Sequence, residues 1–229
     1  MSSAAVTVKE MVNKVLTRMR ENTVGTLNET EQSSAILRLI NDAKREVEDA
    51  FNWTALQDTL TIATVAGTHT YAIEEGSTYT NQRSRVVDVF NDTTDVRLLA
   101  VPYDYARRQS QTTNNEQAEP VQFAVAGITT TQSLNIRFYQ TPDAVYSMQV
   151  EVILPQEDLN AELQYTKVPW YPVYLKALAL AVRERGEDEG EQYSEIQRSY
   201  QQAIGDAIAY EQQHKWQGAG GDWMVLGDY

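Results

Sequence analysis

The chain contains no cysteine and only two histidines among its 229 residues. Without cysteine it can form no disulfide framework, no thiol nucleophile and no thiolate metal site. The two histidines, His69 and His214, have no ligand-type neighbour at helical i, i+4 spacing. Because metal sites need several convergent ligands, we expect no metal here.

Sequence patterns typical of catalysis are also missing. There is no G-x-S-x-G nucleophile elbow, and the glycine-rich run at 218–221 lacks the strand before it and the Lys-Ser/Thr after it that a phosphate loop requires. Carboxylate pairs such as Glu74 and Glu75 could serve a glycosidase, but they also arise by chance in an acidic chain. We expect no enzyme and no cofactor, and keep a hydrolase as the third hypothesis.

Long apolar runs are absent as well. The longest nearly apolar stretch covers residues 173–182 and is interrupted by Lys176. A membrane-spanning helix needs about 20 apolar residues, so no membrane partner is expected. Hydrophobic residues nevertheless make up 42% of the chain, which is enough to form a core.

Basic residues are few, with 19 Lys and Arg against 32 Asp and Glu and a formal net charge of −13. Gripping nucleic acid requires clustered cations, so specific DNA binding is not expected. An acidic surface suits either solubility alone or a wall past which DNA slides without sticking.

The most regular stretch is residues 33–53, where apolar residues recur with a period near 3.6. They are Ile36, Ile40, Ala43, Val47 and Ala50, widened by Leu37 and Phe51, with Arg38, Asp42, Arg45 and Asp49 on the opposite face. This pattern predicts an amphipathic helix. Either Asn28 or Thr30 is placed to cap its first turn.

A second helix is expected before it, from about residue 8 to residue 21. Thr7 and Glu10 have the spacing of a capping box at its start. A helix that long at one end of the chain needs partners for its apolar stripe, and the stretch at 33–53 can supply only part of them.

Two more helices are expected near the other end of the chain. The first starts between Pro169 and Pro172, because proline suits a first helical turn, and its apolar run predicts burial on most sides. The second follows Gly186 and extends to about residue 213. Its apolar stripe consists of Tyr193, Ile196, Tyr200, Ala203, Ile204, Ala207 and Ile208.

Between these helical regions the hydrophobic period changes to two. Alternation predicts six short strands, near residues 60–62, 69–73, 87–89, 121–125, 134–138 and 149–154. A short helix is expected near 102–108, and the polar stretch 110–119 is expected to be a mobile loop.

The predicted fold class is therefore α+β. Neither pair of helices can bury its stripes alone, so residues 1–55 and 166–214 are expected to form one four-helix bundle. Residues 56–165 are expected to form an inserted, small antiparallel β-sandwich or barrel-like domain. Residues 215–229 follow as an extended C-terminal arm.

The arm combines a glycine hinge with large apolar side chains. The hinge residues are Gly218, Gly220 and Gly221, and the anchors are Trp216, Trp223, Met224, Val225, Leu226 and Tyr229. Aromatic anchors on a flexible hinge are typical of a segment that becomes ordered when it binds a partner. Two alternatives are a disordered end that touches nothing and an end that folds back onto the bundle.

The succession of segments resembles the head-to-tail adaptor proteins of tailed bacteriophages, especially the tubular tail proteins of short-tailed phages. The segments are Phe51-Asn52-Trp53, residues 60–62 with 70–73, residues 133–143, residues 148–152, and Pro169-Trp170-Tyr171-Pro172 opening an alanine-rich helix. One departure is Glu74-Glu75-Gly76, which stands where the family has a leucine-proline ending.

This resemblance implies a structural virion protein without enzymatic activity. Such adaptors form a homo-oligomeric ring of about twelve copies at the head-to-tail interface, after synthesis in the host cytoplasm. The ring would dock on the portal protein through the C-terminal arm. It would continue the DNA channel without binding DNA specifically, and would recruit the tail nozzle, the next tail ring or tail fibres.

A second hypothesis comes from a different class of protein. The β domain would act as a ligand-binding module of the virion, as in receptor-binding or fibre-attachment proteins. A monomer or trimer in the mature particle would favour this alternative over a portal-bound ring.

Overall fold

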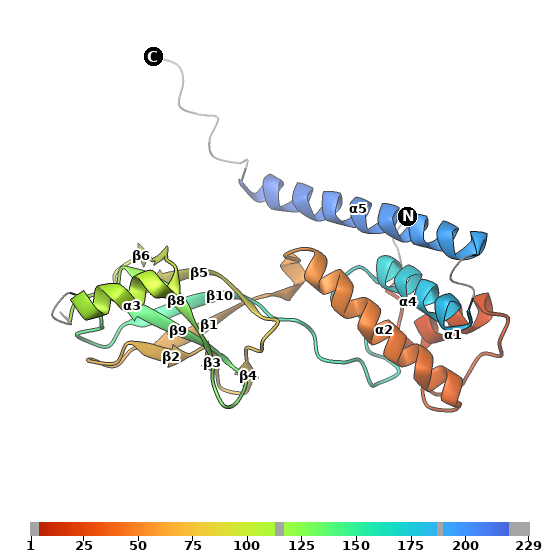
Figure 1. The fold of residues 1–229 in the computed structure, drawn as a ribbon, viewed down its shortest axis with the longest axis horizontal. Helices are drawn as coiled ribbons and strands as arrows, with labels where there is room; N and C mark the ends of the chain where they lie inside the picture. The colour runs from red at the N-terminus through yellow and green to blue at the C-terminus, as the bar shows by residue number, and fades with distance from the viewer. Residues whose placement is uncertain (1–4, 113–116, 187–189, 220–229) are drawn as a thin grey trace, which may run out of the picture. The chain divides into compact units, whose positions relative to one another are not determined.

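The computed structural model describes residues 5–112, 117–186 and 190–219. Their helices and strands form an α+β fold, which confirms the predicted class (Figure 1). The chain separates into two compact units, one from residues 1–55 with 156–229 and one from residues 56–155. We call them the helical unit and the β unit.

Helix α1 (Val8–Arg18) opens the helical unit with the predicted capping box. The Thr7 hydroxyl accepts from the Glu10 amide at 3.2 Å, and the Glu10 carboxylate accepts from the Thr7 amide at 2.8 Å. The helix ends at Arg18 rather than near residue 21, because Arg20 adopts a positive φ of 61° that a right-handed helix does not allow.

Helix α2 (Glu31–Ala50) begins at Thr30, one of the two predicted caps. The Thr30 hydroxyl accepts from the Ser33 amide at 3.0 Å. The predicted apolar stripe is buried at Ile36, Ile40, Ala43 and Val47, whereas Ala50 in the last turn is exposed. After the helix, the indole N–H of Trp53 donates to the Val47 carbonyl at 2.7 Å. The 3-10 helix η1 (Thr54–Leu56) follows.

Four polar side chains of α2 that lie outside the predicted stripe are also buried: Ser33, Asn41, Lys44 and Glu48. The Lys44 ammonium donates to the carbonyls of Gln156 and Glu157 at 2.5 and 2.6 Å, and lies 3.6 Å from the Glu48 carboxylate. These contacts fasten the returning chain to α2.

Asn41 and Glu48 complete this attachment at either side of Lys44. The Asn41 amide group donates to the Leu159 carbonyl at 3.1 Å and accepts from the Leu159 amide at 2.8 Å. The Glu48 carboxylate accepts from the Gln156 amide at 3.2 Å. Segments more than one hundred residues apart in sequence are thereby joined by buried hydrogen bonds.

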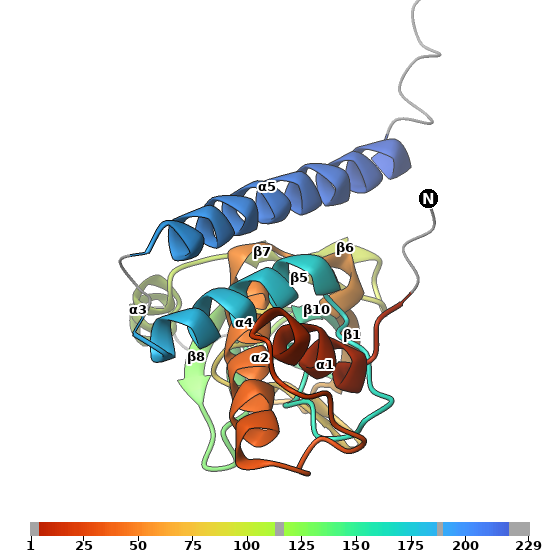
Figure 2. The same ribbon diagram turned by 90° about the vertical axis from the view of Figure 1, so that its right-hand side faces the viewer.

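Helix α4 (Trp170–Glu184) lies at the centre of the helical unit, since it contacts α1, α2 and α5. In Figure 2, α4 runs between α1 and α5. As its alanine-rich sequence predicts, most of its side chains are buried, including Val173, Leu178 and Ala181.

Helix α5 (Glu191–Ala219) is longer than predicted, because it continues past residue 213. Its contact with the rest of the unit is narrow. Of the predicted stripe, Ile196, Tyr200 and Ile204 are buried, whereas the other members are only half-buried. The Tyr200 hydroxyl donates to the Glu46 carboxylate at 3.1 Å, and burial raises the pKa of Tyr200 first, with the Glu46 charge adding to it.

The β unit contains two four-stranded sheets and one small two-stranded sheet within the described residues. The first sheet has the order β1-β10-β5-β6, the second β2-β9-β8-β7, and the third pairs β3 with β4. The strands are β1 (Gln57–Ala63), β2 (Thr70–Ala72), β3 (Glu74–Glu75), β4 (Thr78–Tyr79), β5 (Arg85–Asn91), β6 (Val96–Arg97), β7 (Leu99–Ala100), β8 (Gln122–Ile128), β9 (Leu134–Tyr139) and β10 (Ser147–Ile153).

The six predicted strands all exist, and their pairing is antiparallel. The sequence did not predict the two-residue strands β3, β4, β6 and β7, nor the short parallel pairing of β7 with β8. Such short strands carry too few residues for a period of two to be visible.

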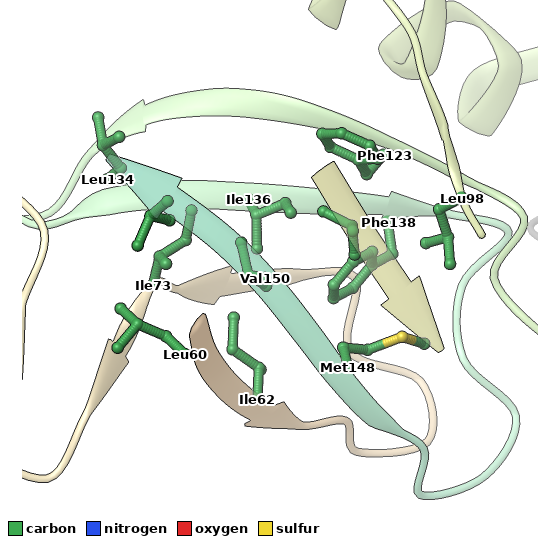
Figure 3. Close-up of a cluster of buried hydrophobic side chains, with 12 residues drawn as sticks. Leu60, Ile62, Ile73, Leu98, Phe123, Leu134, Ile136, Phe138, Met148 and Val150 are labelled. Atoms are coloured by element: carbon green, nitrogen blue, oxygen red, sulfur yellow. The ribbon is translucent and has the colours of Figure 1, made fainter. Parts of the chain in front are cut away.

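One apolar cluster receives side chains from both four-stranded sheets (Figure 3). Leu60, Met148 and Val150 come from the first sheet, and Ile136 and Phe138 from the second. Each large side chain that is fully buried contributes about 1.5–3 kcal/mol of transfer free energy. This cluster is therefore the main stabilising feature of the β unit.

Bulges explain two places where alternation and burial disagree. Between β5 and β10 the register shifts so that Val87 is left without a partner. Its side chain is 43% exposed although Val89 is buried, as expected for the extra residue of a bulge. A second shift in β8 contains Gly127 with a φ of 99°, which favours glycine.

The predicted short helix is present as α3 (Tyr103–Thr112), which packs against β8 and β9. The expectation of a loop over residues 110–119 is wrong at its first part, because α3 continues to Thr112. It is also wrong near its end, where Gln117 forms a bridge with Thr141. Polar composition hid both features, since Ala106 is the single buried residue among those of this helix whose burial is described.

Candidate protein-binding groove

A groove of about 1300 Å³ lies in the helical unit. Helix α1 contributes Lys14 and Arg18 to its wall, and the first turns of α4 contribute Trp170, Tyr171 and Tyr174. The groove is an open depression between two packed helices, with a size adequate for a peptide segment.

The aromatic wall results from the start of α4. Pro169 occupies the N-cap position and α4 begins at Trp170. Residues 170, 171 and 174 therefore lie within the first two turns of the helix. The ring centroids of Trp170 and Tyr171 are 5.6 Å apart, and Tyr171 and Tyr174 stack at 6.3 Å. Tyr171 is 49% exposed. The wall therefore offers a rigid aromatic surface to solvent.

Cations line the groove beside these rings. The Lys14 ammonium lies 5.6 Å from the centre of the Trp170 ring, within the range of a cation–π contact. Arg18 and Arg20 also line the groove. Burial raises the pKa of the Tyr174 hydroxyl, whereas the neighbouring charge of Arg18 lowers it.

Acidic side chains also lie at the groove, since Glu10 lines it and Glu21 pairs with Arg185 in its wall. Glu10 accepts from the Thr7 amide and hydroxyl at 2.8 and 3.0 Å, and the backbone hydrogen bond from Thr7 holds the pKa of Glu10 below its usual value. Glu21 pairs with Arg185 at 2.6 Å. Cationic, acidic and aromatic side chains therefore all contribute to the groove.

A smaller hollow of about 280 Å³ adjoins the groove, since Val6 and Trp170 line both. Glu211 of α5 lies in its wall and accepts from the Thr54 amide at 2.7 Å. Burial raises the pKa of Glu211, but the hydrogen bonds from Thr54 together with the charges of Lys215 and His214 lower it, and the net shift is downward. This hollow extends the depression toward the C-terminal half of α5.

The residues predicted for the C-terminal arm are only partly described. Trp216 and Gly218 belong to helix α5, so the hinge predicted at Gly218 is helical. Gly220, Gly221, Trp223, Met224, Val225, Leu226 and Tyr229 lie outside the described residues.

The residues considered for chemistry do not converge in the described ranges. His69 precedes β2, whereas His214 belongs to α5, with its ring 5.3 Å from that of Tyr210. Glu74 and Glu75 form β3, where Glu75 accepts from the Thr61 amide at 2.9 Å. Within the described residues no group of three potential metal ligands gathers.

No helix in the described part of the chain is both long enough and apolar enough to span a bilayer.

Sequence reasoning missed the groove, although its parts were visible. Lys14 and Arg18 have i, i+4 spacing and therefore share one face of α1. Trp170, Tyr171 and Tyr174 cluster at the start of α4 in the same way. The pairing of α1 with α4, across more than 150 residues of sequence, was the unknown that prevented the two signals from being combined.

The described residues thus form an all-α unit interrupted by an inserted β unit, with an exposed groove lined by cations and aromatic rings in the helical unit. A family model described as SU10 adaptor protein matches residues 6–222. The chain therefore belongs to the SU10 adaptor protein family, and its resemblance to phage head-to-tail adaptors is confirmed. A comparison with curated proteins gives no match.

Proposed function

We propose that the protein is a structural head-to-tail connector that joins the portal to the tail and continues the DNA channel. The observation that carries this proposal is the family match, which extends through both units and includes the groove. An adaptor family implies contacts with other proteins of the phage head and tail. The portal, as one neighbour, and a tail nozzle, further ring or fibre, as the other, are the specific partners of this proposal.

The proposed assembly is a ring of about twelve copies without enzymatic activity, located at the head-to-tail interface of the virion. The helices α1, α2, α4 and α5 would act as one bundle, and the two four-stranded sheets as one sandwich projecting from it. With 32 acidic against 19 basic residues, such a ring would repel the phosphate backbone and let DNA pass without specific binding.

Residues 220–229 enter the proposal as an assembly segment, for which Trp223, Leu226 and Tyr229 provide apolar anchors. In the simplest form of the proposal their receptor is the portal. Removal of these residues would then leave a folded chain that no longer joins the portal.

Mass photometry of the full chain, alone and mixed with the portal protein of the same phage, tests this function. A discrete added mass of about twelve subunits on the portal is the expected result. The absence of association, with the same small oligomer in both samples, would contradict it. That result would favour the second candidate, a receptor-binding or fibre-attachment module, although no feature of the β unit points to a particular ligand.

A further inference from the structure

Strand β1 lies at one end of the first sheet, since the strand order of that sheet is β1-β10-β5-β6. All of its residues, Gln57–Ala63, pair with β10. An edge strand of this length presents a row of backbone amides and carbonyls to which a further strand can hydrogen-bond. The open side of β1 is therefore a surface at which copies of the chain could pair.

The register of β1 against β10 decides which backbone groups face this open side. The Leu154 amide donates to the Leu56 carbonyl at 2.8 Å, and the Thr64 amide donates to the Tyr146 carbonyl at 2.9 Å. Since hydrogen bonding alternates along an antiparallel pair, the even-numbered residues of β1 direct their backbone groups toward β10. The odd-numbered residues consequently direct theirs toward the open side.

Two of these outward amides are already occupied by carboxylates. The Thr59 amide donates to Asp58 at 2.9 Å, and the Thr61 amide donates to Glu75 at 2.9 Å. Asp58 is adjacent in sequence to the amide that it binds, so this contact is local and involves no other element. Glu75 instead reaches β1 from a different element, 14 residues along the chain.

Glu75 belongs to the hairpin of β3 and β4, which lies beside β1 (Figure 1). The hairpin forms a separate two-stranded sheet, and its turn contains Gly76 with a φ of 59°, which favours glycine. The hairpin thus contacts β1 without extending its sheet. The Glu75 side chain supplies an acceptor at the place where an added strand would supply a carbonyl.

We propose that Glu75 closes the open edge of β1 against strand pairing with a second copy of the chain. A second copy is the relevant partner because the edge matches itself. A two-fold axis would set two β1 strands antiparallel, with the exposed side chains of Thr59 and Thr61 available for cross-strand contacts.

Glu75 opposes this pairing in two ways. It occupies the Thr61 amide, and its charge would be brought near the same charge of the second copy across the shared edge. Charged side chains at an open edge are one of the means by which β proteins avoid edge-to-edge association. The inference concerns the free chain and does not depend on the proposed connector function.

Sedimentation equilibrium of the full chain carrying Glu75→Ala tests the inference. The substitution frees the Thr61 amide and removes the charge at the edge, so the weight-average mass should rise with concentration to about twice that of the unaltered chain or more. Glu74→Ala is the matched control, because Glu74 is the exposed neighbour of Glu75 in β3 and its loss changes the net charge equally. This control should sediment as the unaltered chain does.

A second variant tests whether the association uses the edge of β1. Thr61→Pro, added to Glu75→Ala, removes the amide N–H that an added strand would need, and proline is tolerated on an edge strand where the amide faces away from the sheet. The double variant should return to the mass of the unaltered chain. Circular dichroism verifies that each variant is folded.

Three outcomes would overturn the inference. In the first, the mass of the Glu75→Ala chain equals that of the unaltered chain at every concentration. In the second, Glu74→Ala associates equally, which assigns the effect to net charge. In the third, association persists in the folded double variant, which places the contact at another surface.

Discussion

The helical unit and the β unit are stabilised in different ways. The β unit is one continuous stretch of chain around an apolar cluster, and its buried polar residues are uncharged. The helical unit joins two distant stretches, and it holds the two buried charged residues of the described chain, Lys44 and Glu48. The difference suggests that a discontinuous unit uses directional hydrogen bonds to fix where its returning segment attaches.

The largest effect is expected when the attachment of the returning segment to α2 is broken. Replacement Lys44→Ala leaves the Glu48 carboxylate buried without its cation and removes both hydrogen bonds to residues 156 and 157. Loss of one partner of a buried ion pair costs about 3–5 kcal/mol. All four tryptophans lie in residues 1–55 or 156–229, so urea unfolding followed by tryptophan fluorescence measures the helical unit.

The double variant Lys44→Met/Glu48→Leu is the control for that prediction. It removes both charges and restores apolar volume, so it should recover much of the lost stability. Equal destabilisation of the single and double variants would show that the Lys44 hydrogen bonds to the returning segment, rather than the loss of the Lys44–Glu48 ion pair, carry the effect.

The second prediction concerns the apolar core of the β unit. Met148 is fully buried in the cluster, and Met148→Ala should cost about 3 kcal/mol through lost burial and a residual cavity. Hydrogen–deuterium exchange should increase in peptides from residues 56–155, with less change in the helical unit. An equal increase in both units would mean that they unfold together and would weaken the comparison.

A smaller effect is expected at Asn41. Replacement Asn41→Ala removes two hydrogen bonds to the backbone of Leu159 and leaves a buried amide and carbonyl unsatisfied, at a cost of about 2 kcal/mol. Exchange of the Leu159 amide should accelerate more than exchange of the amides within α2. Ser34→Ala, at a half-buried site on the same helix, serves as the matched control and should leave that amide unchanged.

Loss of a helix cap should have a weaker effect still. In Thr30→Ala the Ser33 amide loses its partner at the start of α2, which costs about 1 kcal/mol. Thr30→Ser keeps the hydroxyl and should retain the stability of the unaltered protein in the same urea titration. A serine variant as unstable as the alanine variant would exclude the cap as the cause.

The smallest effect is a dependence on pH at Glu10. Its folded pKa is lowered by the Thr7 hydrogen bonds, so its contribution to stability is present above the unfolded pKa of about 4.3 and is lost as the pH falls through the lower, folded value. Glu10→Gln should therefore lower the free energy of unfolding at pH 7. In strong acid the difference in stability between the variant and the unaltered protein should be smaller. A difference that is constant with pH would contradict this assignment.

Much of the fold could be predicted because helix starts and strand alternation depend on residues that are close in sequence. The capping box at Thr7, the proline at the start of α4 and the alternation in β9 and β10 each depend on a few neighbouring residues. The buried faces of α2 were only half predicted, since Lys44 and Glu48 look like solvated charges until residues 156 and 157 are placed beside them. Burial of a charge depends on a distant partner, which periodicity does not contain.

The site was harder to predict than the fold for the same reason. Glycines and aromatic residues near the C-terminus favoured a binding arm, but α5 extends through Gly218, because helical packing and propensity of the preceding residues outweigh one glycine. The groove needs both Arg18 and Tyr171, and their proximity follows from tertiary packing alone. A binding site built from two helices therefore remained invisible until the helices were paired.

Electron cryo-microscopy of the chain mixed with its portal protein is the most direct test of the account. The account predicts a closed ring of this chain attached to the portal, with a continuous central channel. Particles in which the chain is absent from the portal, or attached as separate fibre-like copies through the β unit, would contradict the adaptor function.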